Sequence, residues 1–229
     1  MKKSLSFLIL FILPTLVFFS CNGSNSSKND DNIDNGHRYV DLGLPSGTKW
    51  ADCNIGASSP TDYGVYLAWG ETSVKNNYNW NTYKYGNDYG KLTKYCTRPD
   101  YGKNGLDDNK TELDLDDDVA HTQWGGKWRM PSKAQIEELI ANTNSQWTTI
   151  KGVNGYLFKA TNGNSIFLPA AGYRSGTSLD CAGSGGYYWS RTLNADYPYY
   201  AYNLGFSSGY MYVNGYNRYY GRTVRPVRP

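Results

Sequence analysis

The residues whose chemistry stands out are the aromatic side chains near the end of the chain. Half of the tyrosines, 11 of 22, fall in the last 45 residues, from Gly185 to Pro229, among asparagine, serine, glycine and arginine. Tyrosine offers a large, stiff contact area at low entropic cost, while serine, glycine and asparagine adapt their hydrogen bonds, as in antibody paratopes. This composition predicts a ligand-binding surface. The residues expected to bind are Tyr187, Tyr188, Trp189, Tyr199, Tyr200, Tyr210, Tyr212, Tyr216, Tyr219 and Tyr220.

The same composition is compatible with plain β-structure, because tyrosine favours strands while glycine and asparagine favour hairpin turns. Alternation along a strand helps to separate the two interpretations. Met211 and Val213 are expected to face the core. Tyr210 and Tyr212 are then expected to face outward. Two outward tyrosines on one short strand are more than a fold needs, which favours a binding surface. Trp189 is the exception, since it could instead belong to the core.

Catalysis finds little support in the sequence. Nucleophilic catalysis needs a nucleophile, a base and an orienting group. The two histidines are His37, at the start of the expected domain, and His121, just before Trp124, and no G-x-S-x-G element occurs. We therefore expect no enzyme, no catalytic residue and no cofactor.

Carboxylates gather between Asp107 and Asp118 and could supply oxygen ligands to Ca²⁺. Their spacing matches no EF-hand loop. A solvated acidic turn that leads into a helix cap is the simpler interpretation, with Asp116 or Asp117 as the cap. No metal site is predicted.

The beginning of the chain is typical of an exported lipoprotein. Lys2 and Lys3 precede an apolar run from Leu5 to Phe19, which is too short to span a membrane, and Cys21 follows directly. We expect a lipoprotein signal peptide over residues 1–20, a lipidated Cys21 with a flexible tether over residues 21–36, and one domain over residues 37–229. The expected location is the outer membrane, at the cell surface or facing the periplasm, with the lipid as the membrane anchor.

The net charge bears on the class of partner, and the cysteines bear on possible disulfide bonds. Removal of Lys2 and Lys3 with the signal peptide lowers the formal net charge from +3 to +1, which argues against nucleic acid as a partner. An exported protein could oxidise one pair among Cys53, Cys96 and Cys181, but their spacing selects none.

The elements that must position the tyrosines are short and aromatic. Strands are expected at Arg38 to Leu44, Thr48 to Ile55 and Gly64 to Trp69, and a hairpin at Gly155 to Leu168. The main helix is expected from about Ser132 to Asn142, because Ser132 and Gln135 form a capping box before an apolar stripe. The arginines near the end are expected to pair with core carboxylates or carbonyl groups.

Several blocks together resemble a known family. They are YVDLGLPSGTKWADCNIGASSPTDYGVYLAWGE, LTKYC, DDDVAHTQWGGKWRMPS, NGNSIFLPAAGYR, GGYYWSRT and GRTVRPV, in this order. Taken together they resemble the Fibrobacter succinogenes major paralogous domain, a family of exported proteins and lipoproteins in gut bacteria related to Bacteroides. The resemblance implies an α+β, C-type lectin-like fold with short twisted antiparallel sheets, one main helix and long ordered loops.

The resemblance also bears on function. Related formylglycine-generating enzymes need a close thiol pair late in the domain, where this chain has Cys181 alone, and the E-P-N, Q-P-D and W-N-D tripeptides of calcium-dependent lectins are absent. In other lectin-like relatives a tyrosine-rich C-terminal segment displays diversified side chains for receptor binding. We expect a surface lipoprotein that binds a glycan or a protein through its tyrosines. The alternatives are a structural subunit of a surface assembly and a degenerate formylglycine-generating-enzyme-like protein.

Overall fold

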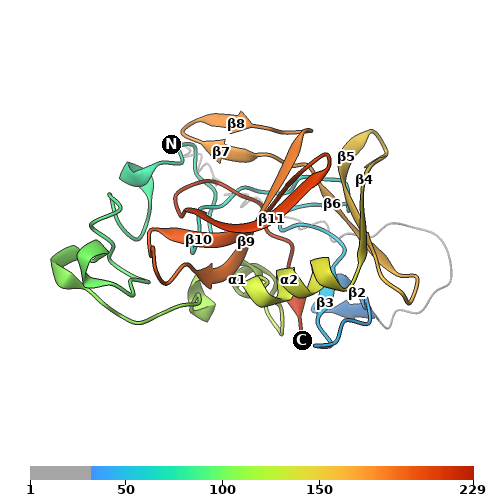
Figure 1. Ribbon diagram of the computed structural model, residues 1–229, viewed down its shortest axis with the longest axis horizontal. Coiled ribbons are helices and arrows are strands. Elements are labelled where there is room, and N and C mark those ends of the chain that lie inside the picture. The colour runs from blue at the N-terminus through green and yellow to red at the C-terminus, as the bar shows by residue number, and fades with distance from the viewer. Residues whose placement is uncertain (1–31) are drawn as a thin grey trace, which may run out of the picture.

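The computed structural model describes residues 32–229, which form twelve short strands and two α-helices (Figure 1). The predominance of strands makes the expected α+β class wrong: the described chain is predominantly β. Its helices are α1 (Val119–Trp124) and α2 (Lys133–Ala141), of six and nine residues. The expected signal peptide and Cys21 lie outside the described residues.

Four antiparallel sheets build the domain. The first has the order β1 (Ile33–Asp34), β2 (His37–Val40), β3 (Lys49–Ala51) and β12 (Val227–Arg228). The second has the order β11 (Tyr210–Asn217), β10 (Tyr200–Ser207) and β9 (Gly185–Leu193). The third contains β4 (Asn144–Ile150), β5 (Val153–Lys159) and β6 (Ser165–Pro169), and the fourth is the hairpin of β7 (Tyr173–Ser175) and β8 (Ser178–Asp180). The first sheet therefore begins at Ile33, inside the segment expected to be a tether.

The sheet β11–β10–β9 lies between two layers (Figure 1). Helix α2 packs against one of its faces, and the β7–β8 hairpin lies on the other side. The capping box predicted for α2 is present, since the Ser132 side chain accepts from the Gln135 amide and the Gln135 side chain accepts from the Ser132 amide. Asp118, rather than Asp116 or Asp117, caps α1.

The expected strand from Gly64 to Trp69 forms one isolated bridge, between Leu67 and Arg222, instead of a ladder. Its partner is the C-terminal segment, residues 218–226, whose Val224 belongs to the core cluster that contains Trp69 and Trp189. Backbone hydrogen bonds join this segment to Leu67, Trp69 and Trp189. One core cluster surrounds Trp69 and Trp189, and the other surrounds Phe206.

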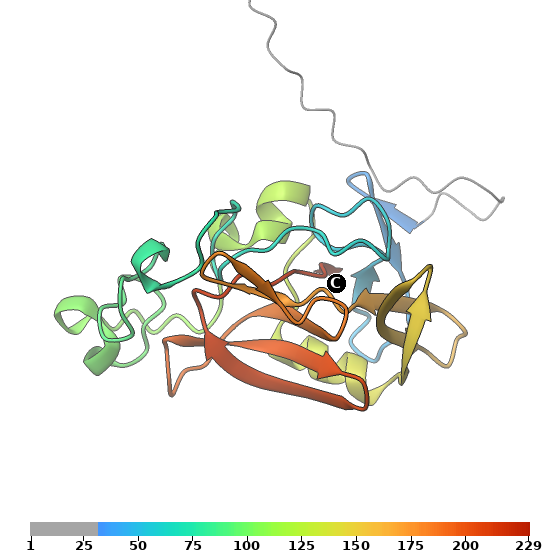
Figure 2. The same ribbon diagram turned by 90° about the horizontal axis from the view of Figure 1, so that it is seen from above.

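The long segment from about residue 76 to residue 118 projects beyond one end of the sheet, as Figure 2 shows from above. The aromatic residues between Asn76 and Gly105 are expected from the sequence to pack internally, and Tyr83, Tyr85 and Tyr95 are buried. Short 3₁₀ turns punctuate it at Trp80–Thr82, Pro99–Tyr101, Lys103–Gly105 and Leu115–Asp117.

Asp117 is the hub that holds this segment. Its carboxylate is 4% exposed and accepts hydrogen bonds from Lys94 Nζ at 2.6 Å, Lys84 Nζ at 3.1 Å and the Tyr95 hydroxyl at 2.6 Å. The Tyr85 hydroxyl donates to it as well. Burial alone would raise the pKa of Asp117, but the hydrogen bonds from Lys94, Tyr85, Tyr95 and Lys84 outweigh it and hold the pKa well below its usual range.

We predict that Asp117→Asn lowers the free energy of unfolding by about 3 kcal/mol at pH 7, because it removes one partner of a buried charged network. Since folding lowers the pKa of Asp117, its contribution is fully present above the unfolded-state pKa of about 4 and is lost as the pH falls through the folded-state pKa. Urea unfolding at pH 7 and pH 3 should therefore show a smaller difference between wild type and variant at pH 3.

The matched control is Asp116→Asn, because Asp116 is exposed and adjacent. It should change the free energy of unfolding by less than about 0.5 kcal/mol. Equal effects of the two substitutions, or a difference that grows towards pH 3, would contradict the role of Asp117.

Candidate functional site

The sheet β11–β10–β9 uses its two faces differently. Leu204 and Phe206 on β10 face the core cluster that also contains Tyr188. Gly205 points the other way, where its cross-strand neighbours are Tyr187 on β9 and Tyr212 on β11. A Cβ atom at Gly205 would lie 2.3 Å from Cζ of Tyr212. The absence of a side chain at Gly205 therefore lets the Tyr212 ring lie flat on the sheet.

A buried guanidinium group lies over this face. Arg222 is 1% exposed, and its Cζ lies 4.5 Å from the ring centre of Tyr216, 4.7 Å from that of Trp189 and 5.2 Å from that of Tyr187. Two further rings, of Tyr173 and Tyr220, complete the set at 5.9 and 5.7 Å. At these distances each ring face attracts the cation. We call these five aromatic residues, together with Arg222, the arginine cage.

The hydroxyl groups of Tyr212 and Tyr216 meet at 3.3 Å next to the cage. Burial and the neighbouring Tyr216 hydroxyl raise the pKa of Tyr212, and burial raises the pKa of Tyr187 to about 12. The Tyr212 and Tyr187 hydroxyls are therefore neutral at pH 7 and can donate hydrogen bonds. Both side chains are half-buried, so the cage is partly open to solvent.

A second group of rings, the distal tyrosine cluster, consists of Tyr89, Tyr101, Tyr197, Tyr199 and Tyr200. Tyr199 is its centre, with ring-centre distances of 4.3 Å to Tyr200, 5.1 Å to Tyr101 and 6.0 Å to both Tyr89 and Tyr197. Tyr89 and Tyr197 are among the most exposed large side chains of the described chain. The cluster thus presents ring faces to solvent on two neighbouring loops.

Arg218 joins the two loops that carry the distal tyrosine cluster. Its guanidinium group donates to the carbonyls of Tyr95 at 2.8 Å, Lys94 at 3.0 Å and Pro198 at 2.7 Å, and its Nε donates to the Tyr83 hydroxyl at 2.9 Å. The loop after residue 88 and the loop before β10 are therefore fastened to one buried side chain.

The predicted binding residues separate into surface and core. Tyr187, Tyr216 and Tyr220 belong to the arginine cage, with Tyr212 beside it, while Tyr199 and Tyr200 belong to the distal tyrosine cluster. Tyr219 packs between Tyr220 and Trp80, at ring-centre distances of 4.6 and 5.2 Å. Tyr210 packs on Tyr212 and is 63% exposed.

Two of the predicted residues do not reach the surface. Tyr188 and Trp189 are 2% and 0% exposed. The reason is that β9 runs between the two core clusters, so Tyr188 packs in one and Trp189 in the other. Tyr188 is therefore removed from the candidate site, and Trp189 remains only as a buried wall of the arginine cage. By contrast, Met211 and Val213 pack against the core as predicted.

Sequence reasoning missed Tyr173, Tyr89, Tyr101, Tyr197 and Arg222. Tyr197 lies inside the tyrosine-rich segment and could have been included on that ground. Tyr89 and Tyr101 belong to a loop distant in sequence, and nothing in its pattern indicates that it meets residues 197–200. Arg222 was grouped with the other terminal arginines.

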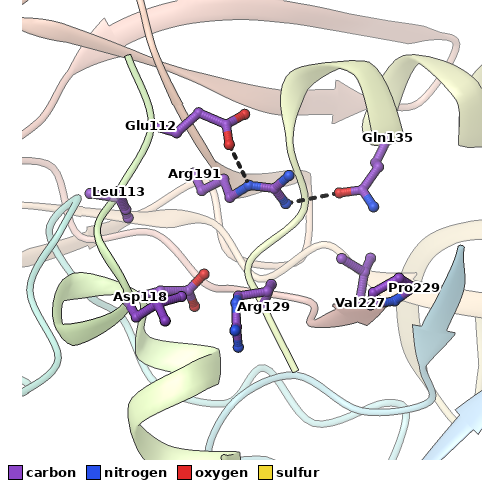
Figure 3. A pocket seen from close by; sticks show the side chains of 9 residues that line it. Glu112, Leu113, Asp118, Arg129, Gln135, Arg191, Val227 and Pro229 are labelled. Carbon is purple, nitrogen blue, oxygen red and sulfur yellow. Dashed lines mark hydrogen bonds and ion pairs between the residues drawn. The ribbon is translucent and has the colours of Figure 1, made fainter. Parts of the chain in front are cut away.

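A cavity of about 350 Å³ lies elsewhere, between the ends of α2, β9 and β12. Figure 3 shows Arg191 between Glu112 and Gln135, at 2.8 and 3.0 Å. Asp118 also lines it, but its carboxylate accepts from the Met130 amide and caps α1. These polar side chains already bond to one another or to the backbone. None of the predicted binding residues lines the cavity. We interpret it as a structural junction.

The titratable side chains outside the tyrosine clusters have structural contacts. Within residues 32–229, no group of three or more His, Cys, Asp or Glu side chains is arranged to hold a metal ion. His121 Nδ1 lies 2.6 Å from Arg129 Nη1, and the His37 ring stacks on Trp124. Cys53 and Cys96 are buried, and Cys181 is exposed. Among these residues, no helix has the length and apolar character needed to cross a membrane.

We predict that Arg218→Lys lowers the free energy of unfolding by about 3 kcal/mol, because an ammonium group cannot reproduce the planar set of hydrogen bonds. Hydrogen exchange should accelerate in residues 94–101 and 195–200 more than in α2. Arg228→Lys is the control, since Arg228 lies 3.3 Å from Asp34 in an ion pair that lysine can keep. Comparable losses of stability in both variants would contradict the fastening role.

Comparison with known proteins gives one match. Residues 141–227 match a family model described as a domain of unknown function (DUF8237). This match covers β4 to β11 and the C-terminal segment, and therefore the cage and part of the distal tyrosine cluster. No curated protein and no solved structure matches the chain.

Proposed function

We propose that the protein binds an external ligand, a glycan or a protein, through the arginine cage and the distal tyrosine cluster. The observation that carries this proposal is the grouping of ring faces from separate loops and strands on partly exposed surface. Tyrosine and tryptophan dominate the energetics of many binding surfaces because they bury large areas at low entropic cost.

The arrangement of the rings supports binding more than plain structure. Strands β9 and β10 already fill the two cores, one with Trp189 and the other with Tyr188, Leu204 and Phe206. The distal tyrosine cluster adds little to that core, because two of its members, Tyr89 and Tyr197, are 58% and 47% exposed. Exposed aromatic groups of this kind mark interaction sites.

We also propose that the protein is a lipoprotein anchored through Cys21 and presented at the outer membrane, as its first residues predict. Membership in the Fibrobacter succinogenes major paralogous domain family remains a proposal that rests on the sequence blocks. A surface location would give the tyrosines access to ligands outside the cell.

A triple variant, Tyr89→Ala with Tyr197→Ala and Tyr210→Ala, tests the proposal. All three side chains are exposed, so the fold should be retained. We expect the affinity for a ligand identified on glycan and cell-surface protein arrays to fall at least about tenfold, because hot-spot aromatics each contribute more than 1 kcal/mol.

The matched control is Tyr202→Ala, a half-buried tyrosine on the α2 side of the same sheet. It should leave binding unchanged. Binding that survives the triple substitution but not the control would move the site to the other face. A purified protein whose measured mass is that of a stable oligomer, with these tyrosines protected, would favour the structural-subunit alternative.

A further inference from the structure

Arg222 differs from the two other buried arginines of the same segment. Arg218, Arg222 and Arg225 are all at most 1% exposed. Arg218 donates four hydrogen bonds. Arg225 donates to Asn54 Oδ1 and to the carbonyls of Ala51, Asp52 and Phe167. Within residues 32–229, Arg222 donates one hydrogen bond, from Nη1 to Asn203 Oδ1, and its buried Nε has no hydrogen-bond partner.

The positive charge of Arg222 also lacks a counter-charge. Among residues 32–229, no carboxylate forms an ion pair with it, and its neighbours are ring faces and one amide oxygen. Burial lowers the pKa of Arg222 to about 10, so the group is still charged at neutral pH. A buried cation with incomplete hydrogen bonding is costly, and such groups call for a functional explanation.

The side chains that separate Arg222 from solvent are hydrogen-bond donors. The Tyr216 ring lies 4.5 Å from the guanidinium carbon, and its hydroxyl meets that of Tyr212 at 3.3 Å. The rings of Tyr187 and Tyr220 lie 5.2 and 5.7 Å from the same carbon. Phenolic hydroxyls donate to oxyanions, and a guanidinium charge beneath them strengthens each such bond in a site of low dielectric constant.

We propose that the arginine cage receives an oxyanion, a carboxylate or a sulfate, carried by an acidic polysaccharide. The oxyanion accepts hydrogen bonds from the hydroxyls of Tyr212 and Tyr216. The buried guanidinium group of Arg222 supplies the positive charge that compensates the negative charge of the oxyanion. The inference rests on the proposed function and names its ligand class. A polysaccharide fits better than an acidic peptide because the exposed rings of the distal tyrosine cluster, Tyr89 and Tyr197, offer flat faces on which sugar rings pack.

The test measures binding of the full chain to polygalacturonate, dextran sulfate and neutral dextran by isothermal titration calorimetry. We expect at least one acidic polymer to bind at least about tenfold more tightly than dextran. Binding of polygalacturonate but not dextran sulfate would identify the oxyanion as a carboxylate. Binding of dextran sulfate but not polygalacturonate would identify it as a sulfate. Binding of dextran as tight as that of both acidic polymers would overturn the oxyanion site while leaving the proposed function standing. Binding of none of the three would overturn the oxyanion site, whereas the proposed function is tested separately by the array ligand and the triple tyrosine variant.

Asn203→Asp makes the test specific to Arg222, because it places a carboxylate where the amide oxygen now accepts from Nη1. With its charge compensated internally, the cage should lose at least about tenfold in affinity for the acidic polymer. The control Asn144→Asp makes the same change of charge at an exposed position on β4, in another sheet, and should bind as the wild type does. Wild-type affinity in Asn203→Asp would overturn the proposal.

A second variant covers the case in which Asn203→Asp does not fold, since it removes the bond from Asn203 Nδ2 to the Asn214 carbonyl at 2.7 Å. Tyr212→Phe with Tyr216→Phe keeps both rings and removes both hydroxyls. It should retain the thermal midpoint within a few degrees and lose at least about tenfold in affinity for the acidic polymer. Undiminished binding in this variant would also overturn the proposal.

Discussion

Buried positive charge near the end of the chain is the constraint on which the rest of the structure depends. Arg218, Arg222 and Arg225 lie in one short segment, whose Val224 is part of the aromatic core around Trp69 and Trp189. A guanidinium group removed from water must find acceptors or ring faces, because an isolated buried charge is costly. Much of the surrounding architecture supplies them: carbonyls of loops far apart in sequence turn towards Arg218 and Arg225, and aromatic rings surround Arg222.

This constraint explains why so many loops are ordered. The chain makes little use of helices, and its strands are short. Long connections are instead held at single polar hubs. Arg218 gathers the loops near Tyr95 and Pro198, and Asp117 gathers two lysines and two tyrosines. Arg218 and Asp117 hold these loops, and therefore their tyrosines, in defined positions. This order reduces the entropy lost when a ligand binds.

Local signals in the sequence were sufficient for some elements and insufficient for others. The capping box at Ser132 and the alternation at Met211 and Val213 depend on near neighbours, and both are found in the structure. The fold class does not depend on near neighbours alone. The α+β expectation is wrong because the main helix is accompanied by many brief strands. The expected surface position of Tyr188 is wrong, and the core alternative given for Trp189 is the one found, because no local pattern reveals that β9 is covered on both sides. The distal tyrosine cluster joins residues about a hundred positions apart, and the isolation of Arg222 depends on which acceptors its neighbours already use.

The most direct measurement of the central claim is the NMR signal of each arginine Nε–H group during titration with polygalacturonate or dextran sulfate. Arg222 lies beneath the proposed oxyanion, whereas Arg218 and Arg225 already have acceptors for their Nε groups. We predict that the Arg222 signal moves and saturates with the ligand while the other two stay in place. An unchanged Arg222 signal at saturating ligand, or equal movement of all three, would contradict the account.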